Sequence, residues 1–192
     1  MTTNRTPATS AASTATTSAA SLLRHLLPAL RALAHRVLID AMTGMAHGLF
    51  ASLILGTILG QLGRLLPGAA GTWLTLLGAI ATSLTGAGIG VGVAHRLKAP
   101  TFVVVGAMVA GQVGARAAAL LSGTALQSDG GAPALVLNGP GEPLGAFIAA
   151  WAAVEAGRLV AGRTSLDILV TPTLSVCAGG SAGLLVGPPI SR

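Results

Sequence analysis

Small residues recur at every fourth position in five long apolar stretches of this chain, and this spacing constrains the fold more than any other feature. The clearest series are Gly44, Gly48, Ser52, Gly56 and Gly60, then Gly145, Ala149, Ala153, Gly157 and Ala161, then Ser175, Gly179, Gly183 and Gly187. A spacing of four puts them on one helical stripe, where two backbones can approach closely. In water each Gly in a helix costs about 1 kcal/mol relative to Ala, whereas in lipid the close packing of small faces holds helices together. The pattern predicts an all-α, polytopic helical transmembrane protein.

Composition supports this class independently. Only 8% of residues are charged and 52% are apolar, with a mean hydropathy of +0.78, whereas about a quarter of a soluble domain is charged. The net charge of +6 does not indicate nucleic-acid binding, because aromatic residues make up only 3% of the chain and the Arg residues lie between apolar runs. Cys177 is the one cysteine, so the chain has no internal disulfide framework.

The first 39 residues differ from the rest. Residues 1–20 are mostly Ser, Thr and Ala, which cannot bury a core, and we expect a disordered tail. In residues 21–39 leucines recur at helical spacing on one face, and the basic residues fall largely elsewhere. This pattern predicts a basic amphipathic helix, which either lies in the membrane interface or packs on the protein. An organellar presequence is an alternative interpretation, although a bacterial N-terminal tail is favoured.

Residues 40–192 are predicted to form the transmembrane domain. Each span approaches the ~20 residues that cross ~30 Å of hydrocarbon, and the five predicted spans are 41–62, 72–94, 100–122, 144–160 and 168–190. Basic residues gather before the first span and in the second and fourth connections, whereas the other side has only Arg64 and Arg192. By the positive-inside rule, the N-terminus is therefore cytoplasmic. The long outer connection, 123–143, is either a re-entrant hairpin or a surface loop with an apolar patch.

Few polar residues fall within these spans, and such residues usually face a cavity or a partner. His47 and Glu155 lie at similar depths from the cytoplasmic helix ends, counted at about 1.5 Å per residue. A helix-packing hydrogen bond of His47, and an ion pair of Glu155 with Arg158, are the alternatives to a binding site and are slightly favoured. Arg116 also lies within a span, and Asp167 at the mouth of the last one.

Several short motifs resemble catalytic or nucleotide-binding patterns. Gly179 to Gly183 match a serine-hydrolase nucleophile elbow, but no His follows in the chain. The glycines at 86, 88, 90 and 92 lack the dinucleotide-binding spacing. They indicate instead a thin or locally broken part of the second span, which another backbone or a ligand approaches. Pro100 and Pro172 are expected to cap or kink their spans. The histidines have no metal-ligand spacing, and we predict no catalytic residue, metal or cofactor.

Three segments carry a family resemblance: Met45 to Phe50, Gly88 to Ala94 with the following Leu97-Lys98-Ala99-Pro100, and Asp167 to Pro172 with the closing Val186 to Ile190. Over about residues 40–190 the chain resembles the enzyme IIC-like permeases of the phosphoenolpyruvate-dependent sugar phosphotransferase system, the branch that includes putative toxin-gene regulators. The resemblance implies a multi-pass protein of the bacterial plasma membrane. Such a protein binds a sugar and presents it to a cytoplasmic IIB partner, which IIA phosphorylates. It is at most the translocating subunit of a protein-phosphohistidine–sugar phosphotransferase.

Family members are longer, so the resemblance also implies that this chain corresponds to their N-terminal half. A natural short form, a split gene and a truncation are all compatible with that. The Gly141-Glu142-Pro143 turn echoes the Gly-Ile-Thr-Glu-Pro turn of glucose-type IIC proteins, whose Glu contacts sugar. We therefore expect a substrate-binding site where the glycine-rich second span meets the outer loop, and its candidate residues are His47, Asn138, Glu142 and Glu155.

Two rival functions remain. The first is a non-transporting membrane sensor or regulator of the same fold. The second is a half-protein scaffold whose exposed small-residue stripes pair with a second copy or with a complementary membrane chain. A membrane-embedded hydrolase is a distant third for want of a nucleophile and base. The sequence names neither the sugar nor the oligomeric state.

Overall fold

The structure, a computed structural model, describes residue 28 and residues 31–32, 34–127, 134–137, 139–163 and 166–190. Contacts divide the chain into two units, Met1–Ile39 and Asp40–Arg192, and the second contains the packed helices. The predicted tail over 1–20 lies outside the described residues. The described residues of the 21–39 segment are helical, and the predicted domain boundaries stay predictions.

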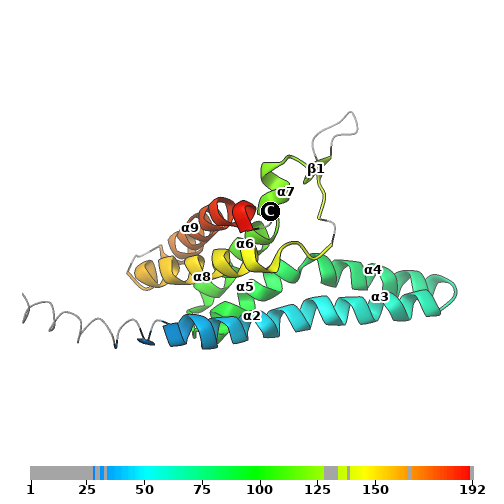
Figure 1. Ribbon diagram of the computed structural model, residues 1–192, viewed down its shortest axis with the longest axis horizontal. Helices are drawn as coiled ribbons and strands as arrows, with labels where there is room; N and C mark the ends of the chain where they lie inside the picture. Colours follow the sequence, from blue (N-terminus) through cyan, green and yellow to red (C-terminus); the bar gives the residue numbers. More distant parts are fainter. Residues whose placement is uncertain are drawn as a thin grey trace, which may run out of the picture. The chain divides into compact units, whose positions relative to one another are not determined.

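The first span is a continuous helix with two π-helical segments. It consists of η1 (Arg36–Ala41), α2 (Met42–Leu49), η2 (Phe50–Ile54) and α3 (Leu55–Leu65). A turn at Gly68, whose φ is 78°, reverses the chain direction before α4 (Ala69–Ser83). The helix is interrupted at Leu84 and continues as α5 (Thr85–Arg96). The axes of α4 and α5 differ by 54°. Figure 1 shows α3 and α4 side by side, as a hairpin that extends beyond the remaining helices of this unit.

Six further elements complete the unit. They are α6 (Thr101–Ala115), α7 (Ala117–Leu121), a short antiparallel pair of β1 (Leu126–Gln127) with β2 (Ala134–Leu135), α8 (Pro143–Val160) and α9 (Asp167–Ile190). Helices α5, α6, α8 and α9 pack on one another as a bundle, and α2 lies against α5 (Figure 1). The buried side chains of this bundle are mostly small, among them Ala107, Ala110, Ala149 and Ala153.

The small-residue stripes are the helix interfaces, as predicted. Gly44 faces Gly92 and Gly48 faces Gly88, so closely that a Cβ atom at any of the four would meet backbone of the opposite helix. Glycines on the other face of α5 meet α6 in the same way. The alternating glycines of the second span therefore serve backbone contact on both sides, which confirms the interpretation drawn from their spacing.

The all-helical, polytopic class is confirmed, with two differences in the spans. Within the described residues, three helices are long and apolar enough to cross a membrane: Ile39–Leu65, Pro143–Val160 and Asp167–Val186. The bent pair α4 and α5 gives a fourth where the two helices together form one broken span. The helix of the predicted span 72–94 is broken after Ser83, and the helix of the predicted span 100–122 is interrupted at Arg116. Helix α6 alone has 15 residues, and the count of five spans stays a prediction.

Candidate functional site

The break in the second span is held open by a side chain from α6. In a continuous helix the carbonyl of Ser83 would accept the N–H of Ala87, four residues later. Here both groups form hydrogen bonds with the Gln112 side chain instead. Its Nε2 donates to the Ser83 carbonyl oxygen at 2.9 Å, and its Oε1 accepts the Ala87 N–H at 3.0 Å. A side chain inserted into the backbone ladder is a recognised cause of a sharp kink.

Hydroxyl groups satisfy neighbouring carbonyls at the same break. Thr85, which is fully buried, donates its hydroxyl to the Thr82 carbonyl at 2.7 Å. The Ile80 carbonyl accepts the hydroxyl of Ser83 at 2.8 Å and the N–H of Leu84 at 3.2 Å. Backbone groups freed within a membrane must find partners inside the protein, and these bonds supply them.

Arg116 joins this break to a second one. It separates α6 from α7, is only 8% exposed, and donates from Nη2 to the Ser83 carbonyl at 3.3 Å and to the Gly139 carbonyl. One guanidinium therefore connects the second span, the end of α6 and the loop that leads into α8. The sequence placed Arg116 inside a span but indicated no partner for it.

The Gly141-Glu142-Pro143 turn docks on the same end of α6. Gly141 has a φ of 72°, and a Cβ atom there would lie 2.6 Å from the Ala115 carbonyl oxygen. The N–H of Glu142 donates to that same oxygen at 2.8 Å. Pro143 begins α8, where its missing N–H costs no helical bond. The half-buried Glu142 side chain does not cap the helix that it precedes.

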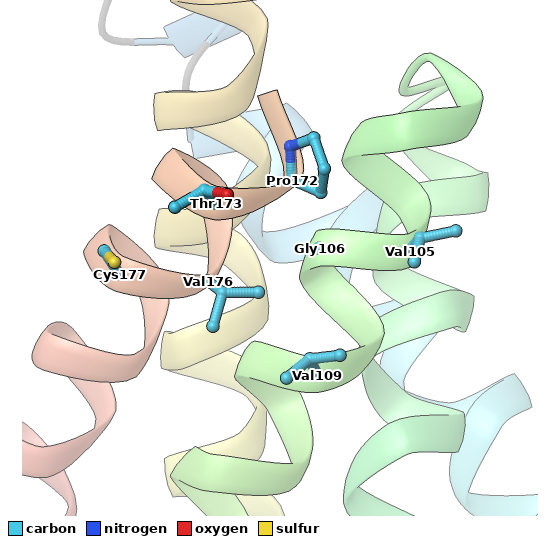
Figure 2. A pocket seen from close by; sticks show the side chains of 7 residues that line it. All are labelled: Val105, Gly106, Val109, Pro172, Thr173, Val176 and Cys177. Carbon is cyan, nitrogen blue, oxygen red and sulfur yellow. The ribbon is translucent and has the colours of Figure 1, made fainter. Parts of the chain in front are cut away.

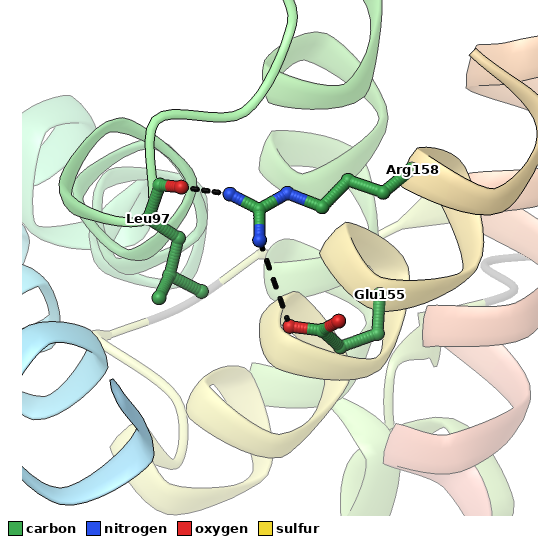
Figure 3. A network of polar contacts seen from close by, with 3 residues as sticks. All are labelled: Leu97, Glu155 and Arg158. Carbon is green, nitrogen blue, oxygen red and sulfur yellow. Dashed lines mark hydrogen bonds and ion pairs between the residues drawn. The ribbon is translucent and has the colours of Figure 1, made fainter. Parts of the chain in front are cut away.

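The two candidate carboxylates lie at opposite ends of α8. Glu142 precedes the helix and Glu155 lies about 20 Å farther along it, at roughly 1.5 Å per residue. Glu155 Oε1 is 3.9 Å from Arg158 Nη1, and Arg158 donates from Nη2 to the Leu97 carbonyl (Figure 3). The ion pair that sequence reasoning slightly favoured for Glu155 is confirmed.

The Leu97 carbonyl belongs to the turn that ends α5. Lys98 adopts the left-handed conformation at a φ of 55°, and the N–H of Ala99 reaches back to the Ala94 carbonyl at 2.9 Å. This is the Schellman arrangement, in which glycine is usual at the left-handed position. Pro100 then caps α6, as predicted. The hydrogen bond from Arg158 to the Leu97 carbonyl joins this turn to α8.

The remaining candidates lie elsewhere. His47 is exposed on α2 and lines a cavity of about 400 Å³ between α2 and α5, together with His95, Ser52 and small residues. Asn138 falls outside the described residues. The backbone of Glu142 thus lies at the end of α6 next to Arg116, whereas Glu155 pairs with Arg158 and His47 lines the cavity beside α5.

Two other places bear on function. A cavity of about 290 Å³ between α6 and α9 is lined mainly by apolar groups, including Val105, Val109 and Val176 (Figure 2), and offers few hydrogen bonds to a sugar. Asp167, at the start of α9, accepts the Thr171 hydroxyl at 2.5 Å and the Gly162 N–H at 3.0 Å, which is a structural cap. Among the residues described, no three His, Cys, Asp or Glu side chains are gathered to hold a metal ion.

Comparison with known proteins agrees with this architecture. A family model described as "Phosphotransferase system, EIIC" matches residues 39–192. The chain belongs to this EIIC family. The EIIC protein is accordingly a membrane component of a phosphotransferase-system permease, a class that acts on sugar together with other phosphotransferase proteins. No curated protein and no solved structure matches the chain.

Sequence reasoning missed Gln112. Two signals could have found it: it is an uncharged amide within an otherwise apolar run, and Arg116 follows four residues later on the same helical face. Neither signal says which groups the amide meets, because the Ser83 carbonyl lies 29 residues away in sequence.

Proposed function

We propose that this EIIC protein translocates a sugar across the bacterial plasma membrane and presents it to a cytoplasmic IIB partner, which donates the phosphoryl group. The polar layer at the broken second span supports the proposal. The Arg116 guanidinium bonds a backbone carbonyl of the break, and the backbone of the Glu142 turn is bonded to the neighbouring end of α6 in an otherwise apolar bundle. Sugar sites combine a few such polar groups with an apolar cavity, and transporters place them at broken helices.

Of the four residues predicted from the sequence, Glu142 and Asn138 are proposed to bind the sugar. Glu142 lies beside the end of α6, and Asn138 precedes Gly139, whose carbonyl Arg116 holds. Glu155 is too far along α8 to touch the same small sugar as Glu142. A carboxylate that accepts two sugar hydroxyls also gives directional selectivity, because its oxygens accept but cannot donate.

The proposed orientation keeps the N-terminus in the cytoplasm. Glu142 then faces the outside, where the sugar arrives. The cytoplasmic end of the bundle carries the Leu97 turn with Arg158 and the 3.7 Å ion pair of Asp40 with Arg96. The positive charges at this end fit the positive-inside rule and suit a docking face for soluble partners.

Ligand-dependent thermal stability tests the proposal. The full chain in detergent is screened against sugars, polyols and their phosphates, and a ligand at 100 times its Kd adds about 2.7 kcal/mol of stability. With the ligand found, Glu142→Gln is expected to weaken binding by roughly 10-fold or more, because a hydrogen bond to a charged group contributes about 1.5–3 kcal/mol. Glu155→Gln is the matched control and is expected to leave affinity unchanged.

Two results would contradict the proposal. Equal affinities of Glu142→Gln and the wild type would remove Glu142 from the site. A flat screen with folded protein, together with no phosphoenolpyruvate-dependent sugar uptake in cells that express the chain, would favour the sensor or scaffold alternatives. For the scaffold, the exposed apolar residues of the α3–α4 hairpin, such as Leu65 and Trp73, predict association with a second copy or a complementary chain, visible by native mass spectrometry.

A further inference from the structure

We propose that Gln112 is the positioning residue of a hinge, about which the α3–α4 hairpin swings against the bundle of α5, α6, α8 and α9. The purpose assigned to this motion, sugar transport, rests on the proposed function, but the hinge itself does not. Two features carry the inference. One is that Gln112 replaces the helical hydrogen bond between Ser83 and Ala87, and the other is a π-helical segment beside that break.

The bonds at the break have a second arrangement. When the Gln112 amide withdraws, the Ser83 carbonyl and the Ala87 N–H can pair with each other and restore a continuous helix. Arg116 can keep its bond, because a carbonyl oxygen accepts two donors. The withdrawn amide then needs new partners, and sugar hydroxyls supply a donor and an acceptor. A ligand that binds the amide therefore favours the straight span, through its different affinity for the two states.

The first span has a matching flexible point. Gly48 faces Gly88 after the break, and Gly56 faces Gly78 before it, so η2 (Phe50–Ile54) lies alongside Leu84. No residue of η2 is buried, and single π-helical turns within α-helices often mark functional sites. The first span and the second span thus each have an irregular segment, and these two segments lie side by side.

Beyond η2 and Leu84, the two helices of the hairpin pack together as one body. Helices α3 and α4 contact chiefly each other, through Gly56 against Gly78 and Gly63 against Thr75. These contacts lie between backbones and cannot slide without overlap. A change at Leu84 therefore moves α3 and α4 together, with η2 absorbing the bend in the first span.

The expected displacement is large. About 16 Å of helix separates Trp73 from Leu84 at roughly 1.5 Å per residue. Closing the bend of 54° would move Trp73 by about 15 Å, twice the arm length times the sine of half the angle. Trp73 is 67% exposed, and the native Cys177 on α9 is exposed, so both positions accept a spin label.

The experiment measures the distance between labels on Trp73→Cys and Cys177 by double electron–electron resonance, with the full chain in lipid nanodiscs. Gln112→Met removes the amide and keeps the side-chain length. It is expected to shift the main distance by more than about 5 Å, a third of the full swing. Gln61→Met, the same change on α3 away from the break, is the matched control and is expected to leave the distance unchanged.

An unshifted distance in Gln112→Met would overturn the hinge. Should that variant not fold, Gln112→Glu keeps the acceptor for the Ala87 N–H and loses the donor to the Ser83 carbonyl. It is expected to add a second distance component, and a single wild-type distance would again overturn the proposal. A shifted distance in a protein that binds no sugar would instead refute the transport function and leave the hinge standing.

Discussion

Substitution by alanine is expected to stabilise the protein at Gly60 and to destabilise it at Gly48, although both glycines belong to one stripe. Alanine in place of glycine within a helix gains up to about 1 kcal/mol. At Gly60 the new Cβ atom meets nothing within 4 Å, so Gly60→Ala is expected to stabilise by about that amount. At Gly48 it meets the Gly88 carbonyl and the Ile89 nitrogen. Overpacking costs about 1–3 kcal/mol, towards the upper end here because backbone cannot rotate away.

The two variants should therefore differ by about 2–3 kcal/mol in the free energy of unfolding. At about 2–4 °C per kcal/mol for a chain of this size, their melting temperatures should differ by roughly 4–12 °C. Scanning fluorimetry of both variants and the wild type in one detergent measures the difference. A Gly48→Ala protein as stable as Gly60→Ala would show that the close approach of α2 and α5 is not a property of the folded chain.

Three further predictions concern stability. Ser175 is fully buried and its hydroxyl has no hydrogen-bond partner among the described residues, so Ser175→Ala is expected to be neutral or to stabilise by about 1 kcal/mol in thermal melts. Lys98→Gly should stabilise by about 1 kcal/mol, because glycine adopts the left-handed conformation at a φ of 55° without the cost that a side chain brings; an unchanged melting temperature would contradict it. Asp167→Ala removes the acceptor for Thr171 and Gly162 and should destabilise by about 1 kcal/mol, seen as faster hydrogen exchange at the start of α9.

Much of the fold could be predicted because its physical causes are local. Gly44 and Gly48 share a stripe whatever surrounds them, since a spacing of four fixes one helical face. Three of the five predicted spans agree with helices of the structure within a few residues. The breaks at Leu84 and Arg116 could not be placed from the sequence, because each depends on groups from another helix.

The candidate site shows the same division. Glu142 was predicted because the Gly141-Glu142-Pro143 turn resembles a sugar-contacting turn of glucose-type IIC proteins. The structure shows how the backbone of this turn packs on α6, and the role of Glu142 stays a prediction. Gln112 was missed because an amide in an apolar run has no local signature for the carbonyl that it meets. The grouping of His47 with Glu155 rested on equal depth alone and stays a prediction, because depth does not say which face of which helix a residue occupies.

The sequence by itself determined that this chain is a membrane protein of closely packed helices, because apolar composition and small-residue spacing act within each helix and need no partner to be read. Tertiary structure alone decided where those helices break and which polar groups meet there. The carbonyl of Ser83 and the amide of Gln112 lie 29 residues apart in the chain. Their hydrogen bond arises only when α6 packs against the second span, since the freed backbone must find a partner where water is absent.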